Sequence, residues 1–162
     1  YRAIVAEARR LMPGIALTTD IIVGFPGETD AGFEQTASAM EEIRFDSAFM
    51  FVYSPRRGTR ASVMENPVPE EVSDARLQRI IALQRRISDE ISRSRIGHLE
   101  EVLVDGPNPR RAGEMMGKTR TFKPAIFAGP LDWIGTVRRI RITGARGVTL
   151  SGEALVEALP FA

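Results

Sequence analysis

The segment TTDIIVGFPGETD, residues 18–30, places a glycine-rich turn and a carboxylate directly after an apolar run. Residues 15–23 are apolar enough to form a strand, and the Gly-x-Pro-Gly turn at 24–27 prevents its regular continuation. Ligands of parallel α/β folds bind outside the carboxyl ends of strands, and glycine lets backbone approach them closely. The segment therefore predicts a binding loop. A tight strand-to-helix turn, with Glu28 favouring the start of the next helix, explains the same residues without a ligand.

A second loop of this kind follows a second apolar run. Residues 47–53, SAFMFVY, are continuously apolar, which is typical of a strand covered on both faces. The loop SPRRGTRAS comes directly after it. Helical periodicity in residues 1–12 and 29–44 gives the order helix, strand, helix, strand, which predicts a parallel pair with a right-handed crossover.

Residues 69–97 predict a long helix that begins at Pro69 and ends at Gly97. Its apolar stripe predicts the buried face and consists of Leu77, Ile80, Leu83, Ile87 and Ile91. Arg79, Arg86 and Arg93 recur every seven residues on another face, which is best explained as a solvated surface.

From Leu99 onward, short β-like runs separated by glycine and proline predict a small barrel or sandwich. These runs are EVLVD, TFKPAIF, GTVRRIRIT and VTLSGEAL. In GTVRRIRIT, Arg139 and Arg141 lie on the face opposite Ile140 and Ile142, whereas Arg138 needs a bulge or an edge position to join them.

The net charge of +1 conceals a strong local asymmetry. Between Pro107 and Gly147 there are nine basic residues and only two acidic ones. A basic barrel that also carries Phe122 and Phe127 indicates an RNA or single-strand binder. An ordinary solvated surface explains the charge equally well.

The composition excludes several classes of site. The chain has no cysteine and a single histidine, His98, so we expect no disulfide, no thiolate metal site and no cysteine nucleophile. No apolar run approaches the length of a bilayer span and the amino terminus is not signal-like, so we expect a cytoplasmic protein without membrane contact.

Four motifs in order, TTDIIVGFPGET, RFDSAFMFVYSPRRGTRAS, GKTRTFKPAIFAG and RITGARGVTLSGE, resemble the carboxyl-terminal half of the radical S-adenosylmethionine methylthiotransferases. The resemblance implies an α/β plus all-β chain. Residues 1–97 would be the last part of a partial (β/α)6 radical-SAM barrel, including the connecting helix 69–97. Residues 98–162 would be a TRAM domain, a small OB-like RNA-binding barrel.

Within the family, FDSAF followed by YSPR is similar to the type that modifies an isopentenylated adenosine beside the tRNA anticodon, so tRNA is the expected substrate. The type that modifies a ribosomal protein and a stand-alone RNA-binding module are the alternatives.

The resemblance also implies two sets of site residues. Those expected at S-adenosylmethionine are Gly24, Phe25, Pro26, Gly27, Glu28, Ser54, Pro55 and Arg56. Those expected to share one face and follow an RNA backbone are Lys118, Arg120, Lys123, Arg138, Arg141 and Arg146. Arg57 and Arg60 stand where the family commonly has proline, so no role is carried to them. Asp20 either contacts substrate or makes a structural hydrogen bond.

The family's chemistry requires two 4Fe-4S clusters, and the radical cluster is held by a CxxxCxxC motif that this chain lacks. We therefore expect a fragment that is inactive alone, holds no metal or cofactor, and contains no catalytic residue. Its expected partners are a tRNA anticodon arm and the missing amino-terminal part of the enzyme. The truncated barrel would leave an unpaired edge and an uncovered apolar face, which predicts self-association.

Overall fold

The computed structural model describes residues 1–158 and divides the chain into two compact units, Tyr1–Ser88 and Asp89–Ala162. The elements of the first unit are helix α1 (Arg2–Leu11), strand β1 (Thr18–Val23), helix α2 (Asp30–Ile43), strand β2 (Ser47–Val52), the short 3-10 helix η1 (Arg60–Val63) and most of helix α3 (Glu70–Arg93). Helix, strand, helix, strand is the order expected from the sequence.

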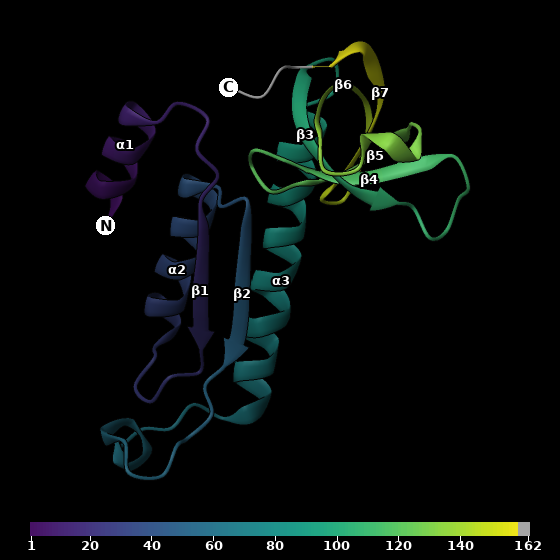
Figure 1. Cartoon of the computed structure of the whole chain (residues 1–162). Helices are drawn as coiled ribbons and strands as arrows, with labels where there is room; N and C mark the ends of the chain where they lie inside the picture. The colour runs from purple at the N-terminus through teal and green to yellow at the C-terminus, as the bar shows by residue number, and fades with distance from the viewer. Residues whose placement is uncertain (159–162) are drawn as a thin grey trace. The chain divides into compact units, whose positions relative to one another are not determined.

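Strands β1 and β2 form the predicted parallel pair, with Ile21 opposite Met50. Helices α2 and α3 lie beside this pair (Figure 1). The two strands point the same way, and the loop after β1 leads to α2 while the loop after β2 leads to η1 and α3. The core of the unit is built from Val23 and from the buried faces of the helices, including Phe33, Met40 and Ile80.

The second face of the sheet is not covered by any part of residues 1–88. Ile22, Phe49 and Phe51 alternate with buried or half-buried neighbours, and each is more than half exposed. The expectation that residues 47–53 are covered on both faces is therefore wrong for this chain, whereas the expected uncovered apolar face is present. A continuous apolar run indicates that both faces of the strand are apolar, but it does not indicate which residues cover them. Residues 1–88 cover only one face of this sheet.

Helix α2 begins as its sequence predicts. The Thr29 side chain accepts a hydrogen bond from the Gly32 N–H at 3.1 Å, which satisfies one of the free donors of the first turn. The helix ends at Arg44, whose φ of 55° turns the chain toward β2.

Helix α3 buries polar side chains that an apolar stripe does not reveal. Ile80 and Ile87 are fully buried as expected, but Gln84 and Ser88 are buried between and beside them. Gln84 Nε2 donates to the Phe45 carbonyl at 2.8 Å, and Ser88 Oγ donates to the Asp46 carbonyl at 3.0 Å. The helix thereby satisfies buried carbonyls of the turn that leads into β2.

The second unit contains a closed five-stranded barrel, as expected of a small OB-like domain. Its elements are β3 (Leu99–Pro107), β4 (Glu114–Thr119), β5 (Pro124–Ala128), the short η2 (Leu131–Trp133), β6 (Val137–Arg146) and β7 (Thr149–Ala158). The strand order is β3-β4-β5-β7-β6, and only the β5–β7 pair is parallel (Figure 1). The barrel core consists of Val102, Val104, Met115, Ala125, Phe127, Ile140, Ile142 and Leu150.

Strand β4 was not among the strands expected from the sequence. Its alternation places Met115, Gly117 and Thr119 inward, so a glycine occupies a core position. A Cβ at Gly117 would overlap the Leu103 carbonyl and the Val102 side chain, because β3 crosses too closely for any side chain.

Candidate nucleic-acid interface and ligand loop

The outer surface of the barrel over β4, β3 and β6 is a candidate nucleic-acid interface. On β6, Ile140 and Ile142 are buried and Arg139 and Arg141 are exposed, which confirms the predicted alternation. The pairing of β6 with β7 shifts register between Arg138 and Ile140. An irregularity of this kind was expected at Arg138, but it does not bring Arg138 onto the face of Arg139 and Arg141, because its guanidinium lies over Trp133.

Strand β3 carries the middle row of this surface. Val102 and Val104 point into the core, so Glu101 and Leu103 point outward between the neighbouring strands. In register, Glu101 lies opposite Arg139 on β6, and Leu103 lies opposite Lys118 on β4. We call the surface formed by Leu99, Glu101, Leu103, Lys118, Arg120, Arg139 and Arg141 the outer basic face.

Arg120 is exposed at the end of β4 and forms an ion pair with Glu101. Arg141 donates to the Gly97 carbonyl at a long 3.4 Å, and Arg139 has no ion pair or hydrogen bond among the described residues. The face therefore combines one partly neutralised arginine with two that are available to an anion.

The six basic residues expected on one face are divided by the structure. Lys118, Arg120 and Arg141 lie on the outer basic face, and Arg146 is exposed at the β6–β7 turn. Lys123 is only 6% exposed, in the turn that joins β4 to β5, so it does not lie on this face. The half-buried Arg138 lies 4.5 Å from the centre of the Trp133 ring.

Sequence reasoning left Arg139 out of the set, although the alternation of β6 had placed it beside Arg141.

The two phenylalanines also differ, because Phe127 belongs to the barrel core while Phe122 is 73% exposed. Inward parity along β5, set by Ala125, decides the position of Phe127. Phe127 is therefore excluded as a nucleic-acid contact, contrary to the expectation from the sequence.

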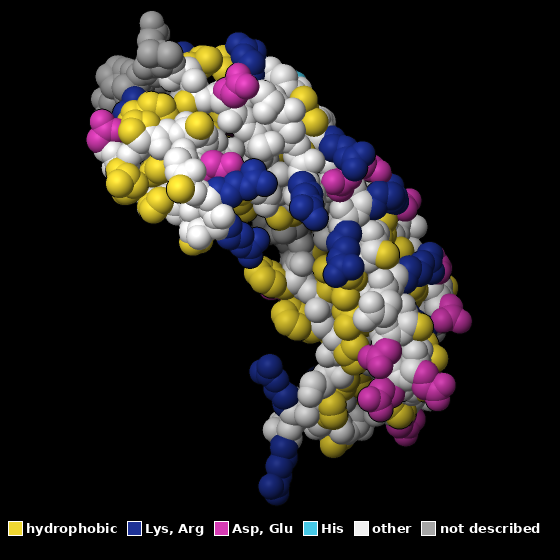
Figure 2. All heavy atoms as spheres, turned by 90° about the vertical axis from the view of Figure 1, so that its right-hand side faces the viewer, with side chains coloured by type: hydrophobic (Ala, Val, Ile, Leu, Met, Phe, Trp, Pro, Cys, Tyr) yellow, Lys and Arg dark blue, Asp and Glu magenta, His cyan; other side chains and the backbone are white. Residues whose placement is uncertain are grey.

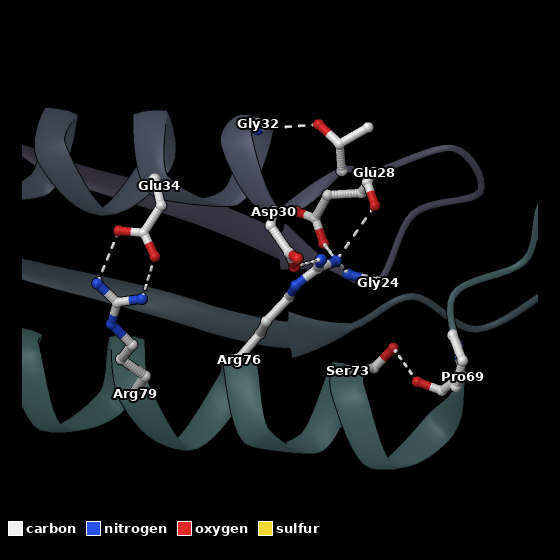
Figure 3. A network of polar contacts seen from close by, with 10 residues as sticks. Gly24, Glu28, Asp30, Gly32, Glu34, Pro69, Ser73, Arg76 and Arg79 are labelled. Atoms are coloured by element: carbon white, nitrogen blue, oxygen red, sulfur yellow. Dashed lines mark hydrogen bonds and ion pairs between the residues drawn. The ribbon is translucent and has the colours of Figure 1, made fainter.

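In the first unit, a polar network fixes the Gly-x-Pro-Gly loop (Figure 3). The Glu28 carboxylate accepts from the Gly24 N–H at 2.8 Å and from the Arg76 guanidinium at 2.7 Å. Arg76 also bonds Asp30 at 2.6 Å, and the hydrogen bond to Asp30 is the main cause of its raised pKa. Glu28 and Arg76 are both largely buried, so this carboxylate ties the loop to α3.

The two glycines of the loop have different surroundings. Both adopt a left-handed φ, 75° at Gly24 and 84° at Gly27, which disfavours other residues. A Cβ at Gly24 would overlap the Ser73 side chain on α3, whereas one at Gly27 would meet no atom within 4 Å. The space beside Gly24 is thus filled by the protein, whereas the space beside the Gly27 Cα is empty and the Gly27 N–H donates to the Asn66 carbonyl at 2.8 Å.

The second loop lies against the first at the carboxyl ends of β1 and β2. The Tyr53 N–H donates to the Val23 carbonyl at 2.8 Å, and the Phe25 and Tyr53 rings meet edge to face at 5.0 Å. The Tyr53 hydroxyl is buried without a hydrogen-bond partner among the described residues. Ser54, Pro55 and Arg56 are exposed beyond it, while Pro26 is buried. Asp20 is exposed on the uncovered sheet face.

The arginine row of α3 is not merely solvated. Arg79 pairs with Glu34 and Arg86 pairs with Glu41, so two of the three arginines link α3 to α2. Arg93 pairs with Asp89 one turn earlier on its own helix. On the face shown in Figure 2, basic and acidic side chains lie next to one another. The hydrogen bond between Arg79 and Glu34 raises the pKa of Arg79 and lowers the pKa of Glu34.

Within residues 1–158, no three His, Asp or Glu side chains come together as a metal site. None of the helices in this part of the chain is both long and apolar enough to span a bilayer.

Comparison with known proteins finds one domain family and several similar enzymes. Residues 93–155 match the TRAM domain family. The chain is 45% identical over 153 residues to the tRNA-2-methylthio-N(6)-dimethylallyladenosine synthase of Moorella thermoacetica, covering 94% of this chain and 34% of the relative. Identity to the enzyme of that name from Anoxybacillus flavithermus is 46% over 159 residues, covering 98% and 30%. For Akkermansia muciniphila it is 42% over 152 residues, covering 94% and 33%. The chain spans about a third of the length of these relatives.

Proposed function

We infer from this similarity, which runs through both units, that the chain belongs to the methylthiotransferase family, and we propose that it is the carboxyl-terminal portion of a tRNA-2-methylthio-N(6)-dimethylallyladenosine synthase. Such an enzyme adds a methylthio group to C2 of N6-isopentenyladenosine next to the anticodon. Residues 1–97 would complete its radical-SAM barrel and residues 98–162 would form its TRAM domain. The names of the relatives favour tRNA over a ribosomal protein, and the first unit argues against a stand-alone RNA-binding module.

The observation that carries the RNA-binding part of the proposal is the outer basic face. Arg139 and Arg141 are exposed on β6 and form no ion pair among the described residues, and Lys118 and Arg120 lie across β3 from them. Cations held at strand spacing fit the phosphates of an RNA backbone, because such contacts give affinity and orientation without reading sequence. The TRAM domain would then hold the anticodon arm while the rest of the enzyme selects the nucleotide.

The Gly-x-Pro-Gly loop at residues 24–27 and the second loop beside it would form part of the binding site for S-adenosylmethionine. This group would supply the radical chemistry when bound. Three features support this role: the Tyr53 hydroxyl, which has no hydrogen-bond partner among the described residues, the empty space beside the Gly27 Cα, and the exposed Phe25 ring. Gly24 and Glu28 support it indirectly, because their bonds to each other and to Arg76 fix the loop.

The two 4Fe-4S clusters of the full-length enzyme do not fit this chain, which contains no thiolate donor. We therefore propose that the chain alone neither assembles a cluster nor cleaves S-adenosylmethionine. Anaerobic reconstitution with iron and sulfide is expected to leave the visible spectrum featureless. A stable cluster absorbance with stoichiometric iron would contradict the proposal.

RNA binding is tested with an anticodon arm that contains N6-isopentenyladenosine, titrated across a salt series. We expect Arg139→Ala with Arg141→Ala to weaken binding and to make the log–log salt slope shallower by about one to two units. Arg79→Ala, which removes an arginine paired with Glu34, is the matched control and should change neither quantity. Lys123 is unsuitable for this test because its substitution would disturb the buried turn. Unchanged affinity and slope in the double variant would refute the role of this face.

We also propose that the uncovered sheet face contacts the missing amino-terminal part of the cytoplasmic enzyme, and that the isolated chain self-associates through it. Phe49 and Phe51 expose large apolar area on strands whose outer edges are unpaired among the described residues. Light scattering should detect dimers or larger species, and Phe49→Asp with Phe51→Asp should shift them to monomer. A wild-type chain that stays monomeric at high concentration would count against this contact.

A further inference from the structure

The turn between β4 and β5 places an aromatic ring in solvent at a strained backbone position. Phe122 has a φ of 63°, a conformation that is an outlier for a bulky residue, and its side chain gains little from burial because the residue is 73% exposed. The turn itself is closed by backbone bonds, Phe122 N–H to the Thr119 carbonyl at 2.9 Å and Thr119 N–H to the Lys123 carbonyl at 3.0 Å. Glycine would satisfy these bonds without the strain.

One cation lies over this ring, and a second is close to it in the sequence. The Lys118 ammonium lies 4.0 Å from the ring centre, over one of its two faces. Arg120 lies two residues before Phe122 and is held at the surface by Glu101. Lys118 lies over one face of the ring and Phe122 is 73% exposed, so the ring can stack with another planar group beside the Lys118 ammonium.

We propose that Phe122 is a stacking platform for an unpaired RNA base, and that Lys118 and Arg120 bind the phosphates on either side of that base. The inference rests on the proposed function, since it requires RNA as the ligand. It deepens that function because it makes the preferred ligand a single-stranded loop. A base can stack on a protein ring only when it has left its own stack, whereas phosphate contacts alone do not distinguish a loop from a duplex.

Because the Phe122 backbone is strained, a structural role and an RNA-binding role of the ring predict opposite changes in stability when Phe122 is replaced by glycine. If the ring served folding, its removal would lower the stability of the chain. If it serves RNA, Phe122→Gly should keep or raise the thermal midpoint, because glycine adopts the left-handed conformation freely, and should still weaken binding to a loop.

The experiment measures affinity of the full chain for two RNAs with equal numbers of phosphates, a hairpin with an anticodon-type loop and a blunt duplex. We expect the wild type to prefer the hairpin, and Phe122→Gly to lose about 5- to 150-fold in hairpin affinity with little change for the duplex. The salt slope should be unchanged in Phe122→Gly. Phe122→Trp should retain the preference, and Arg120→Ala, the matched charge control, should weaken both RNAs and flatten both slopes.

The possible failures separate the inference from the proposed function. A wild type that binds neither RNA overturns both. A wild type that binds both RNAs, with Phe122→Gly having no effect or weakening the two equally, overturns the stacking platform and leaves the phosphate-binding face intact. Loss of the thermal transition in Phe122→Gly would show that the ring is needed for folding and would overturn the proposal, even if Phe122→Trp were as stable as the wild type.

Discussion

Arginine has opposite surroundings in the two units of this protein. In the first unit, Arg76 is buried, bonds two carboxylates and lies over the Phe33 ring, so its charge is used to hold a loop, a helix start and α3 together. On the barrel, Arg139 and Arg141 are exposed on β6, and neither forms an ion pair among residues 1–158, although Glu101 and Glu153 lie opposite them in register. Arginine thus joins several elements through ion pairs in the first unit, whereas on β6 it is exposed without an ion pair among the described residues.

The distribution of acidic residues along the chain explains this difference. Residues 70–97 contain six basic and five acidic residues, and α3 also faces the acids of α2. Between Pro107 and Gly147 two acidic residues face nine basic ones, so most of these cations have no local counter-charge. Unpaired positive charge on one face attracts a polyanion over distances set by the ionic strength.

The largest effect is expected from removing the Arg76 side chain, which would test the difference between the two units most directly. Arg76→Ala would leave the Glu28 carboxylate buried without its cation, and we expect the free energy of unfolding to fall by about 3–5 kcal/mol. Urea unfolding followed by circular dichroism measures this. Arg86→Ala, which breaks an exposed pair with Glu41, is the control and should cost about 0–1 kcal/mol. Equal losses in the two variants would show that Arg76 contributes no more to stability than a surface arginine.

The second prediction concerns the loop that Arg76 holds. Ala at Gly24 or at Gly27 meets the same left-handed backbone, but only Gly24→Ala also overlaps Ser73. We expect Gly24→Ala to be less stable than Gly27→Ala by about 1–3 kcal/mol, the usual cost of overpacking. Chemical unfolding of the two variants side by side measures the difference, and Ser73→Gly should recover part of it in the Gly24→Ala background. Indistinguishable variants would mean that α3 does not press on this loop.

The third prediction sharpens the description of the barrel arginines as anion sites. Glu101 neutralises Arg120 and lies opposite Arg139, so it competes with RNA phosphate for the outer basic face. We expect Glu101→Gln to tighten anticodon-arm binding by about two- to fivefold at low salt, consistent with the modest energy of an exposed pair. Glu42→Gln, which removes the carboxylate of an exposed pair with Arg2 in the first unit, is the control and should have less effect. Weaker binding in Glu101→Gln would show that the pair positions Arg120 for RNA.

The smallest expected effect is on a single exposed pair of the first unit. The hydrogen bond from Arg79 lowers the folded-state pKa of Glu34, so the stability it adds is present above the unfolded pKa and is lost as pH falls through the folded pKa. Arg79→Ala should raise the Glu34 pKa and remove this part of the acid dependence. An NMR titration of Glu34 measures the change, and an unaltered titration would mean that the pair does not persist in solution.

Much of the fold could be predicted because local patterns and tertiary packing agree. The period of α2, its Thr29 cap and the alternation of β6 each state a local preference that the structure keeps. Strand β4 escaped prediction because Gly117 replaces the expected apolar residue, and the reason is its contact with β3, far away in sequence. The polar positions Gln84 and Ser88 of α3 were missed for a similar reason, since their partners lie on the α2–β2 turn.

The candidate site was predicted less well than the fold. Residue type and local charge identified a basic barrel, but Lys123 proved to be buried and Arg139 was left out. A lysine next to a strand reads as exposed unless the turn that buries it is known. The exposed, strained Phe122 could be named from its type alone, while its φ and the Lys118 ammonium over its ring required the structure.

The sequence by itself determined the absence of thiolate chemistry, the order of helices and strands, and the concentration of positive charge in the second unit, because these depend on composition and on periods of two and 3.6 residues. Only the tertiary structure decided that the Ser73 side chain fills the space beside Gly24 and that Glu28 bonds Arg76. It also decided which cations of the barrel form ion pairs across strands, as Arg120 does with Glu101. These properties depend on atoms that lie far apart in the chain, and no local pattern encodes their distance.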